Sequence, residues 1–528
     1  MTSLKNFSKG KFIPAIIFFS GLLFCHITGN RGVYPIDSFS HFDSGFRILN
    51  GEHPFKDYWI VSGFFVDYFQ SLIFLFFGVS WQSYILNASI LNGFISTLVY
   101  YLFTRLGLGL KSSFFYSICF ALLAYPSSGT PFVDHHSTFL SLISVIFLIL
   151  AIKTKKLYFW FLIPFFLFLS FLSKQVPATY IFLSVILIIS FHLLHQTRKE
   201  SFKIISILFF SSLFSIIFLI IFFKIVSIDY KDFIIQYILY PSTIGNERYN
   251  AINYDLKNVF YNFKFIYLAL FFLLYFTFKN FKKEFFYRGI DFKISLICIL
   301  IFISFAQHII VTKNQIFIFF LIPLFLGLAH LQIKNNDNLK KFFNYLLIIF
   351  CVLATLKYHL RFNVDRKFHE LNGVQFSNAV SSSKLSKKLF GLKWISPRKN
   401  TKYETLLEVN ELNAYKTILL KDKSKKIIIT NYSLFSVLLN ENVSSYSRWF
   451  PGDNSAFPIK GNIFFNKFSN FISSTFINRN IDSIYLLPDV DEKNLTDYIN
   501  SNCLIKKELD YKIIKFDIDK NCKNFALD

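Results

Sequence analysis

The fold of this chain is decided by residues 137–195, which read STFLSLISVIFLILAIKTKKLYFWFLIPFFLFLSFLSKQVPATYIFLSVILIISFHLLH. Three apolar runs, at 137–152, 157–173 and 178–195, are separated by a lysine-rich stretch and by a short polar turn. An α-helix of about 20 apolar residues spans a bilayer core, where every backbone polar group must be satisfied within the protein. The stretch therefore predicts three consecutive membrane-spanning helices.

The same pattern recurs along most of the chain. Apolar residues make up 53% of the sequence, and 73 of the 528 residues are phenylalanine, a composition that excludes a water-soluble fold. We therefore predict an α-helical polytopic membrane protein with about eleven transmembrane helices. The further spans lie at 12–28, 84–104, 113–126, 203–228, 259–278, 294–311, 315–331 and 342–358.

One apolar run, FFVDYFQSLIFLFFGV at 64–79, carries Asp67, Gln70 and Ser71 on one face and is predicted to lie in the membrane interface. Every second connection between spans is then basic, and the positive-inside rule assigns these connections to the cytoplasm. We expect a multi-pass protein of a bacterial inner (plasma) membrane. The basic residues are Lys5, Lys9, Lys11, Arg105, Lys111, Lys153, Lys155, Lys156, Arg198, Lys199, Lys203, Lys279, Lys282, Lys283, Arg288, Lys293, Lys334, Lys340 and Lys341.

The net charge of +24 thus marks helix ends that meet membrane lipids, and it does not indicate nucleic-acid binding. The opposite, periplasmic side carries 29–63, 126–136, 229–258 and everything after about 359. We predict a transmembrane domain at 1–358 and a small periplasmic α/β domain at 359–528, with strands near 425–430 and 483–487. Cys503 and Cys522 flank a strand-turn-strand pattern; they can form a disulfide in an oxidising compartment or remain free thiols.

The first outer loop, YPIDSFSHFDSGFRILNGEHPFKDYWIVSGFFVDYF at 34–69, is rich in acids and aromatics. Ionisable groups at a bilayer surface are candidate functional residues. Asp37 begins a helical stripe, and a glycine and a proline then break the helix before Asp57, so two carboxylates can converge. The alternatives are a helix cap for Asp37 and a turn aspartate for Asp57. Asp43 and Glu52 are expected to be solvated.

These residues resemble the GT-C superfamily of membrane glycosyltransferases, in the branch similar to protein mannosyltransferases and lipopolysaccharide-core sugar transferases. The resemblance rests on Asp37 and on a G-x-x-P-[FY]-x-D-[YFW] element, here GEHPFKDY at Gly51 to Tyr58, followed by a juxtamembrane helix that ends at Gly78. It covers mainly residues 10 to 200. This chain departs from the pattern in two ways: one acid opens the loop where relatives often carry an Asp-Glu pair, and SGFF replaces a glycine-proline element.

The resemblance implies a GT-C-like fold and inverting transfer of a hexosyl or pentosyl group from a polyprenyl-phosphate donor to a lipid or saccharide acceptor outside the cytoplasm. Asp37, with Asp43 as the alternative, takes the position of the general base, a role worth about 10²- to 10⁴-fold in rate. Asp57 is expected to orient sugar or acceptor. The branch is generally thought to need no metal or other cofactor.

The second outer loop, PSSGTPFVDHHS, presents Asp134, His135 and His136 at the mouth of a helix. A carboxylate beside two imidazoles can bind a divalent ion, but adjacent histidines point in different directions on a helix. We expect hydrogen bonding to the donor sugar by Asp134 and His135 and no metal, with a structural loop as the alternative.

A departing phosphate needs a cation, because charge grows on its oxygens as the glycosidic bond breaks. Lys174, in FLSKQVP, is the first candidate, followed by Arg248 and Lys313. Each can instead extend to lipid headgroups. His308 is expected to be a satisfied core residue, and Arg448 to pack within its own domain.

Two further functions fit this sequence less well. A transporter or flippase of lipid-linked saccharides would place charges near the bilayer midplane and often shows repeats, whereas the charges here cluster at one surface. An O-antigen polymerase or ligase would differ chiefly in using a saccharide block as donor.

Overall fold

The structure is a computed structural model that describes residues 12–124, 129–280, 289–313, 316–333, 338–364, 371, 373–397, 399–519 and 522. The chain divides into two compact units. The first comprises residues 1–29, 88–219 and 251–372, and the second comprises residues 30–87, 220–250 and 373–528. The predicted boundary between residues 358 and 359 stays a prediction.

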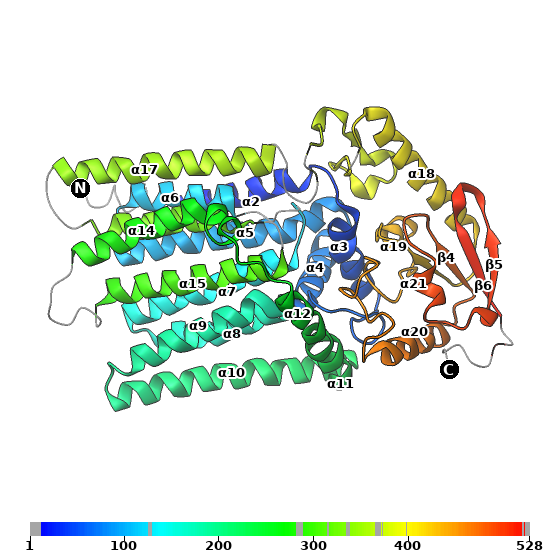
Figure 1. Ribbon diagram of the computed structural model, residues 1–528, viewed down its shortest axis with the longest axis horizontal. Helices are drawn as coiled ribbons and strands as arrows, with labels where there is room; N and C mark the ends of the chain where they lie inside the picture. The colour runs from blue at the N-terminus through cyan, green and yellow to red at the C-terminus, as the bar shows by residue number, and fades with distance from the viewer. Residues whose placement is uncertain are drawn as a thin grey trace. The chain divides into compact units, whose positions relative to one another are not determined.

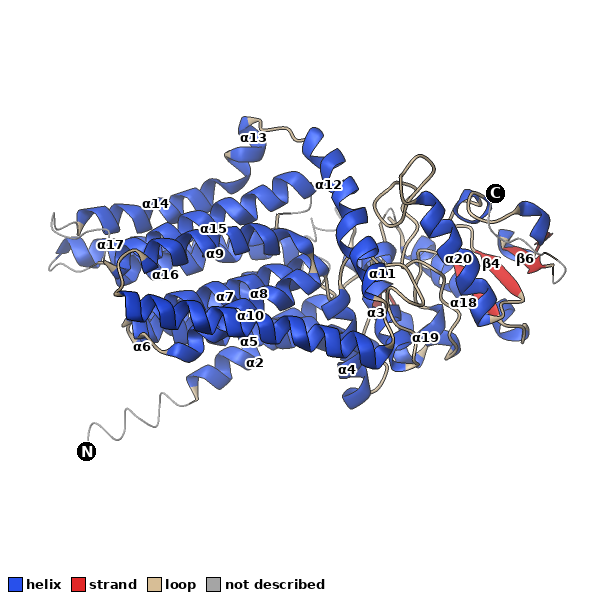
Figure 2. Cartoon of the chain, turned by 90° about the horizontal axis from the view of Figure 1, so that it is seen from below, coloured by secondary structure: helices blue, strands red, loops and turns tan. Residues whose placement is uncertain are grey.

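The first unit is helical, and a helix covers each of the eleven predicted spans (Figure 1). In both views α7, α8, α9 and α15 lie side by side (Figures 1 and 2). The helices are α2 (Ile13–Gly29), α5 (Trp81–Leu106), α6 (Leu110–Leu123), α7 (Val133–Thr154), α8 (Leu157–Ser173), α9 (Gln175–Leu193), α10 (Arg198–Val226), α14 (Lys264–Lys279), α15 (Ile290–Thr312), α16 (Leu321–Leu331) and α17 (Asn338–His359). Residues 81–87 of α5 and residues 220–226 of α10 are counted in the second unit.

Seven helices of the described residues are long and apolar enough to cross a membrane, and the other four predicted spans are shorter apolar helices. α10 shows the physical reason most clearly, because only 17% of its most apolar window is buried in the protein. Its outward side chains include Phe209 and Phe218, both exposed. Such a surface needs lipid around it, and the prediction of a multi-pass membrane protein is confirmed.

The cytoplasmic assignment of the basic connections stays a prediction. Of the residues behind it, Lys5, Lys9, Lys11, Lys282, Lys283, Arg288 and Lys334 lie outside the described residues.

The second unit begins with α3 (Pro35–Leu49) and α4 (Phe64–Phe77), which pack on each other. α4 buries the polar face carrying Asp67 and Gln70, and its exposed side is formed by residues such as Leu75 and Phe76. Its 14 residues cover about 21 Å, which is short of a bilayer core. The unit also holds α11 (Tyr230–Ile234), the π-helix η1 (Ile235–Leu239) and α12 (Tyr240–Asn250).

The C-terminal part of the second unit contains a four-stranded sheet in the order β3-β4-β6-β5. Its strands are β3 (Lys426–Ile429), β4 (Ser483–Leu486), β5 (Leu504–Glu508) and β6 (Ile514–Ile518), so the predicted strands and the small C-terminal α/β part are confirmed. β3 and β4 are parallel, whereas β6 is antiparallel to both β4 and β5.

Helices cover both faces of this sheet. Ile427 and Ile484 pack with α20 (Phe465–Arg479), whereas Ile428 and Tyr485 pack with α18 (Lys402–Lys421). Because successive side chains of a strand point to opposite faces, strands buried on both sides contain continuous apolar runs, as Ile427 to Ile429 do here.

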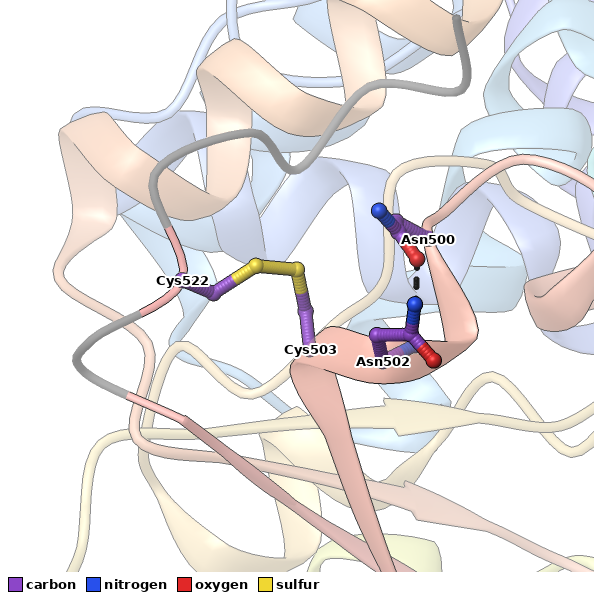
Figure 3. Close-up of a disulfide and its surroundings, with 4 residues drawn as sticks. All are labelled: Asn500, Asn502, Cys503 and Cys522. Carbon is purple, nitrogen blue, oxygen red and sulfur yellow. Dashed lines mark hydrogen bonds between the residues drawn. A yellow bond between two sulfur atoms is a disulfide. The ribbon is translucent and has the colours of Figure 1, made fainter.

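Cys503 and Cys522 form a disulfide across the ends of the β5–β6 hairpin (Figure 3). Cys503 ends a short 3-10 turn, in which the side chain of Asn500 accepts a hydrogen bond from the backbone N–H of Asn502 at 3.1 Å. Of the two alternatives for this cysteine pair, the structure shows the disulfide.

Candidate functional site

Asp134, Lys174 and His308 form a hydrogen-bonded cluster inside the first unit. The Nζ of Lys174 donates to both carboxylate oxygens of Asp134, each at 2.8 Å. The Nε2 of His308 lies 2.7 Å from Oδ1 of the same carboxylate. Asp134 and His308 are buried, and the Lys174 side chain is 15% exposed. The lysine is therefore the member of the cluster that can meet a ligand.

The elements that carry these residues explain why they meet. Asp134 is the second residue of α7, where a carboxylate is favoured by the positive end of the helix dipole. Lys174 lies at the junction of α8 and α9, and His308 lies one turn before the end of α15. Because α7 packs against α8, α9 and α15, the three side chains converge.

Hydrogen bonds of serine hydroxyl groups fix the position of Lys174 along the axis of α7. Ser137 donates to the backbone carbonyl of Lys174 at 3.1 Å, and Ser170 donates to the carbonyl of Ser137 at 2.7 Å. Ser141 pairs with Ser170 at 2.7 Å. Small residues that hydrogen-bond between transmembrane helices allow a close approach of the backbones. The lysine is thus held by a rigid pair of helices.

An apolar cavity of about 470 Å³ lies among α8, α9 and α10. Phe171 and Ala178, three residues before and four residues after Lys174, contribute to its wall. The rest of the wall is aliphatic and aromatic, apart from three hydroxyl side chains. Cavities that bind small molecules and lipids are commonly of this size and composition.

The other predicted residues of this group lie elsewhere. His135 is buried, its Nε2 is 3.0 Å from the carbonyl of Ala124, and its ring packs on Phe139. Lys313 is exposed at the C-terminal end of α15. Arg248 belongs to the second unit, where it is partly exposed on α12. Substrate binding by these three residues stays a prediction.

In the second unit, Asp37 and Asp43 have opposite surroundings on the same helix. α3 begins at Pro35 with Tyr34 as its N-cap, so Asp37 lies in the first turn and is partly exposed. Asp43 is buried and accepts a hydrogen bond from Ser444. Burial raises the pKa of Asp43, and the nearby Arg47 lowers it by less. When this unit is considered alone, Asp37 is the one of the two candidate bases that an acceptor can reach.

The GEHPFKDY element folds as a tight turn that Asp57 closes. Its Oδ2 accepts a hydrogen bond from the backbone N–H of His53 at 2.6 Å. Phe55 adopts a positive φ of 70°, and its carbonyl accepts a hydrogen bond from Gln236 of the π-helix η1 at 2.8 Å. The structural alternative for Asp57, a turn aspartate, is therefore realised, and the carboxylate is partly exposed.

Asp43 and Glu52 are buried or nearly so, and the expectation that they are solvated was wrong. Glu52 is 12% exposed and pairs with Arg47 at 2.8 Å and with Arg479 at 3.0 Å. The guanidinium of Arg47 also lies over the ring of Tyr58, 3.9 Å from its centroid. Charges that leave water need partners of this kind, and here Arg47 is close in the sequence whereas Arg479 comes from a distant part of the chain.

A second set of buried, hydrogen-bonded side chains connects α3, α4 and the segment after β3. Nδ1 of His41 lies 2.7 Å from Oδ1 of Asp67, and Oδ2 of Asp67 accepts a hydrogen bond from Arg448. Arg448 also donates to the carbonyl of Ser62 at 2.8 Å. Burial lowers the pKa of Arg448 to about 10, so the side chain stays charged at neutral pH. Arg448 is thus buried against residues of 62–67, which lie outside the predicted domain at 359–528, and the expectation that it packs within its own domain was wrong.

Reasoning from the sequence missed His308 as a member of the Lys174 cluster. The sequence did contain a usable signal. His308 is an ionisable residue inside an apolar helix, near the end that the predicted topology places on the same side of the membrane as Asp134. Among the described residues no group of three or more His, Cys, Asp and Glu side chains is arranged to hold a metal ion. The metal-free site stays a prediction.

Comparisons with known proteins assign no family to this chain. No protein-family model matches it, and no curated protein sequence matches it. The crystal structure of ArnT from Cupriavidus metallidurans bound to undecaprenyl phosphate is similar over 96% of this chain and 98% of that chain, at 8% identity and a TM-score of 0.43. A likeness at that TM-score carries no argument about the fold or the function of this chain.

Proposed function

We propose that this chain is a membrane glycosyltransferase that moves a sugar from a polyprenyl-phosphate donor to a cell-envelope acceptor on the periplasmic side. The observation that carries the proposal is the position of Lys174, which is partly exposed and lies in the sequence between Phe171 and Ala178, two residues that line an apolar cavity in the membrane unit. A polyprenyl phosphate has the matching chemistry, with an anionic head on a long apolar chain. The resemblance of the first outer loop to GT-C enzymes supports the same conclusion.

The proposed reaction is a single displacement at the anomeric carbon. The acceptor hydroxyl attacks that carbon, its proton passes to the carboxylate of Asp37, and the bond between the anomeric carbon and the phosphate oxygen breaks. The electron pair of that bond leaves with the phosphate, whose growing charge Lys174 stabilises. The configuration of the sugar inverts because one displacement occurs.

The structure suggests a positioning role for Asp134 in this scheme. Both its oxygens are occupied by Lys174 and His308, and the side chain is buried. A carboxylate in this position fixes the orientation of the lysine side chain. We therefore assign phosphate binding to Lys174 and its orientation to Asp134, while Asp57 remains the candidate for orienting sugar or acceptor.

The test is transfer of radiolabel from polyprenyl-phosphate sugars to a cell-envelope acceptor extract by the purified protein in nanodiscs. Label transfer that is lost in Lys174→Gln and in Asp37→Asn supports the proposal. Lys156→Gln is the matched control, because Lys156 is exposed at the other end of α8. Wild-type transfer in both site variants contradicts the assignment of the residues, and absence of transfer with every single-sugar donor contradicts the function and favours a polymerase or flippase.

A further inference from the structure

A second cavity lies at the end of the first unit opposite to Lys174. It is formed where α7 and α9 end and where α8 and α10 begin, and its volume is about 80 Å³. That space is several times what one water molecule needs. Lys155 and Lys203 line the cavity from two different helices, and both are exposed. The positive-inside rule assigns this end to the cytoplasm.

One residue in the wall of this cavity, His192, is hydrogen-bonded to a buried lysine. Lys293 of α15 is 4% exposed, and its Nζ lies 3.0 Å from Nδ1 of His192, a lining residue that is 7% exposed. An ammonium has only donors, so Nδ1 accepts the hydrogen bond. Trp160 stacks on the histidine ring, with the ring centroids 5.6 Å apart. The histidine is therefore fixed between a cation and an aromatic ring.

The charges around the cavity are unbalanced. No ion pair joins Lys293 to any residue that the structure describes. Among the described residues that line the cavity there is one carboxylate, Glu200, which accepts hydrogen bonds from the backbone and the hydroxyl of Thr197 at the start of α10. Against it stand Lys155, Lys203 and Lys293. A buried ammonium is costly without a counter-charge, and an anion that enters the cavity would offset that cost.

We infer that this cavity binds a phosphate group. A phosphate presents several acceptor oxygens to the lysines, and basic pockets between transmembrane helices are known to bind anionic headgroups. Exposed apolar side chains lie at the same helix ends, including Leu157 at the start of α8, Leu194 at the end of α9 and Phe202 in the first turns of α10. A phospholipid headgroup and a soluble phosphate compound share the required chemistry, so the experiment has to separate them. The inference does not depend on the proposed sugar transfer.

The test is native mass spectrometry of the full-length protein in detergent, titrated with dioleoyl phosphatidic acid, dioleoyl phosphatidylcholine or inorganic phosphate. We expect phosphatidic acid to bind in preference to phosphatidylcholine. Each of Lys155→Gln, Lys203→Gln and Lys293→Gln should weaken this binding by about fivefold, as expected for one lysine near a membrane surface. Lys199→Gln is the matched control, since Lys199 lies exposed on the same helix as Lys203 but does not line the cavity.

The arms of the experiment also identify the source of the phosphate. Competition by inorganic phosphate supports a soluble ligand, whereas binding of the lipid without such competition supports a headgroup. Equal binding of phosphatidic acid to the wild type and to all three variants, or no preference over phosphatidylcholine, would overturn the inference. Lys155→Gln and Lys203→Gln change exposed side chains, so the test does not depend on whether Lys293→Gln folds. Sugar transfer is not measured, and its failure would leave this result unaffected.

Discussion

Both carboxylate oxygens of Asp134 accept hydrogen bonds from the Nζ of Lys174, each at 2.8 Å. The acid lies in the first turn of a helix and is buried, while the lysine remains partly exposed. An ammonium held in this way has lost its rotational freedom before any ligand arrives. Such preorganisation is what makes a fixed cation effective against a developing negative charge.

The first prediction concerns this pair as a unit. Lys174→Gln and Asp134→Asn should each lower kcat/KM by about 10²- to 10³-fold, because either change removes the oriented cation. The double variant should be little worse than either single variant, since residues that act as a unit are non-additive. The measurement is steady-state label transfer by all three variants, with Lys156→Gln as control. Additive losses would show that the two residues act separately.

The second prediction separates the two candidate bases. Asp37→Asn should lower transfer by about 10²- to 10⁴-fold, whereas Asp43→Asn should retain most of it, because Asp43 is buried. Transfer by both variants is compared after confirming that each elutes as a folded, monodisperse protein. Loss of transfer in Asp43→Asn alone would reverse the assignment.

The third prediction follows from the raised pKa of Asp43. Burial raises this pKa, so the folded chain binds the proton more readily than the unfolded chain. The resulting stabilisation is present at low pH and is lost as the pH rises through the folded-state pKa. The melting temperature of the wild type relative to Asp43→Asn should therefore fall as the pH increases from about 4 to about 7. A difference that stays constant or grows over this range contradicts the prediction.

The fourth prediction concerns Asp67 and Arg448, which lie 381 residues apart in the sequence and form a buried ion pair. Asp67→Leu or Arg448→Met should each destabilise the second unit by about 3–5 kcal/mol, because each leaves one charge buried without its partner. The loss in free energy of unfolding in the double variant should be smaller than the sum of the losses in the two single variants. Chemical unfolding in detergent, arranged as a double-mutant cycle, measures the coupling, and simple additivity would refute it.

Local patterns in the sequence were sufficient to predict the membrane helices and the strands β3 and β4. The apolar runs predicted the membrane helices, and the short runs around Ile428 and Tyr485 predicted β3 and β4. Their boundaries differ by a few residues, since polar residues such as Asp134 continue a helix that the apolar pattern placed further along. Hydrophobic periodicity depends on neighbouring residues alone, which is why it can be detected without a fold.

The partners of charged residues could not be predicted in this way. Asp43 and Glu52 were expected in solvent because acids usually are, yet Ser444 and Arg479, some 400 positions later, enclose them. His308 meets Asp134 across 174 positions. Nothing in the local sequence encodes these pairings, because they arise from the packing of whole elements.

The fifth prediction concerns the disulfide between Cys503 and Cys522. The bond closes a loop with a sequence separation of 19 that contains β5 and β6. Closing a loop of this size is worth about 3 kcal/mol, mainly through the unfolded state. Reduction should therefore speed hydrogen exchange of the hairpin amides at 504–518 by about 100-fold. The paired variant Cys503→Ser/Cys522→Ser should exchange at that faster rate with or without reductant, whereas α7, far from the cysteines in the sequence, should be unaffected. If reductant leaves hairpin exchange in the wild type unchanged, the disulfide does not hold this edge of the sheet.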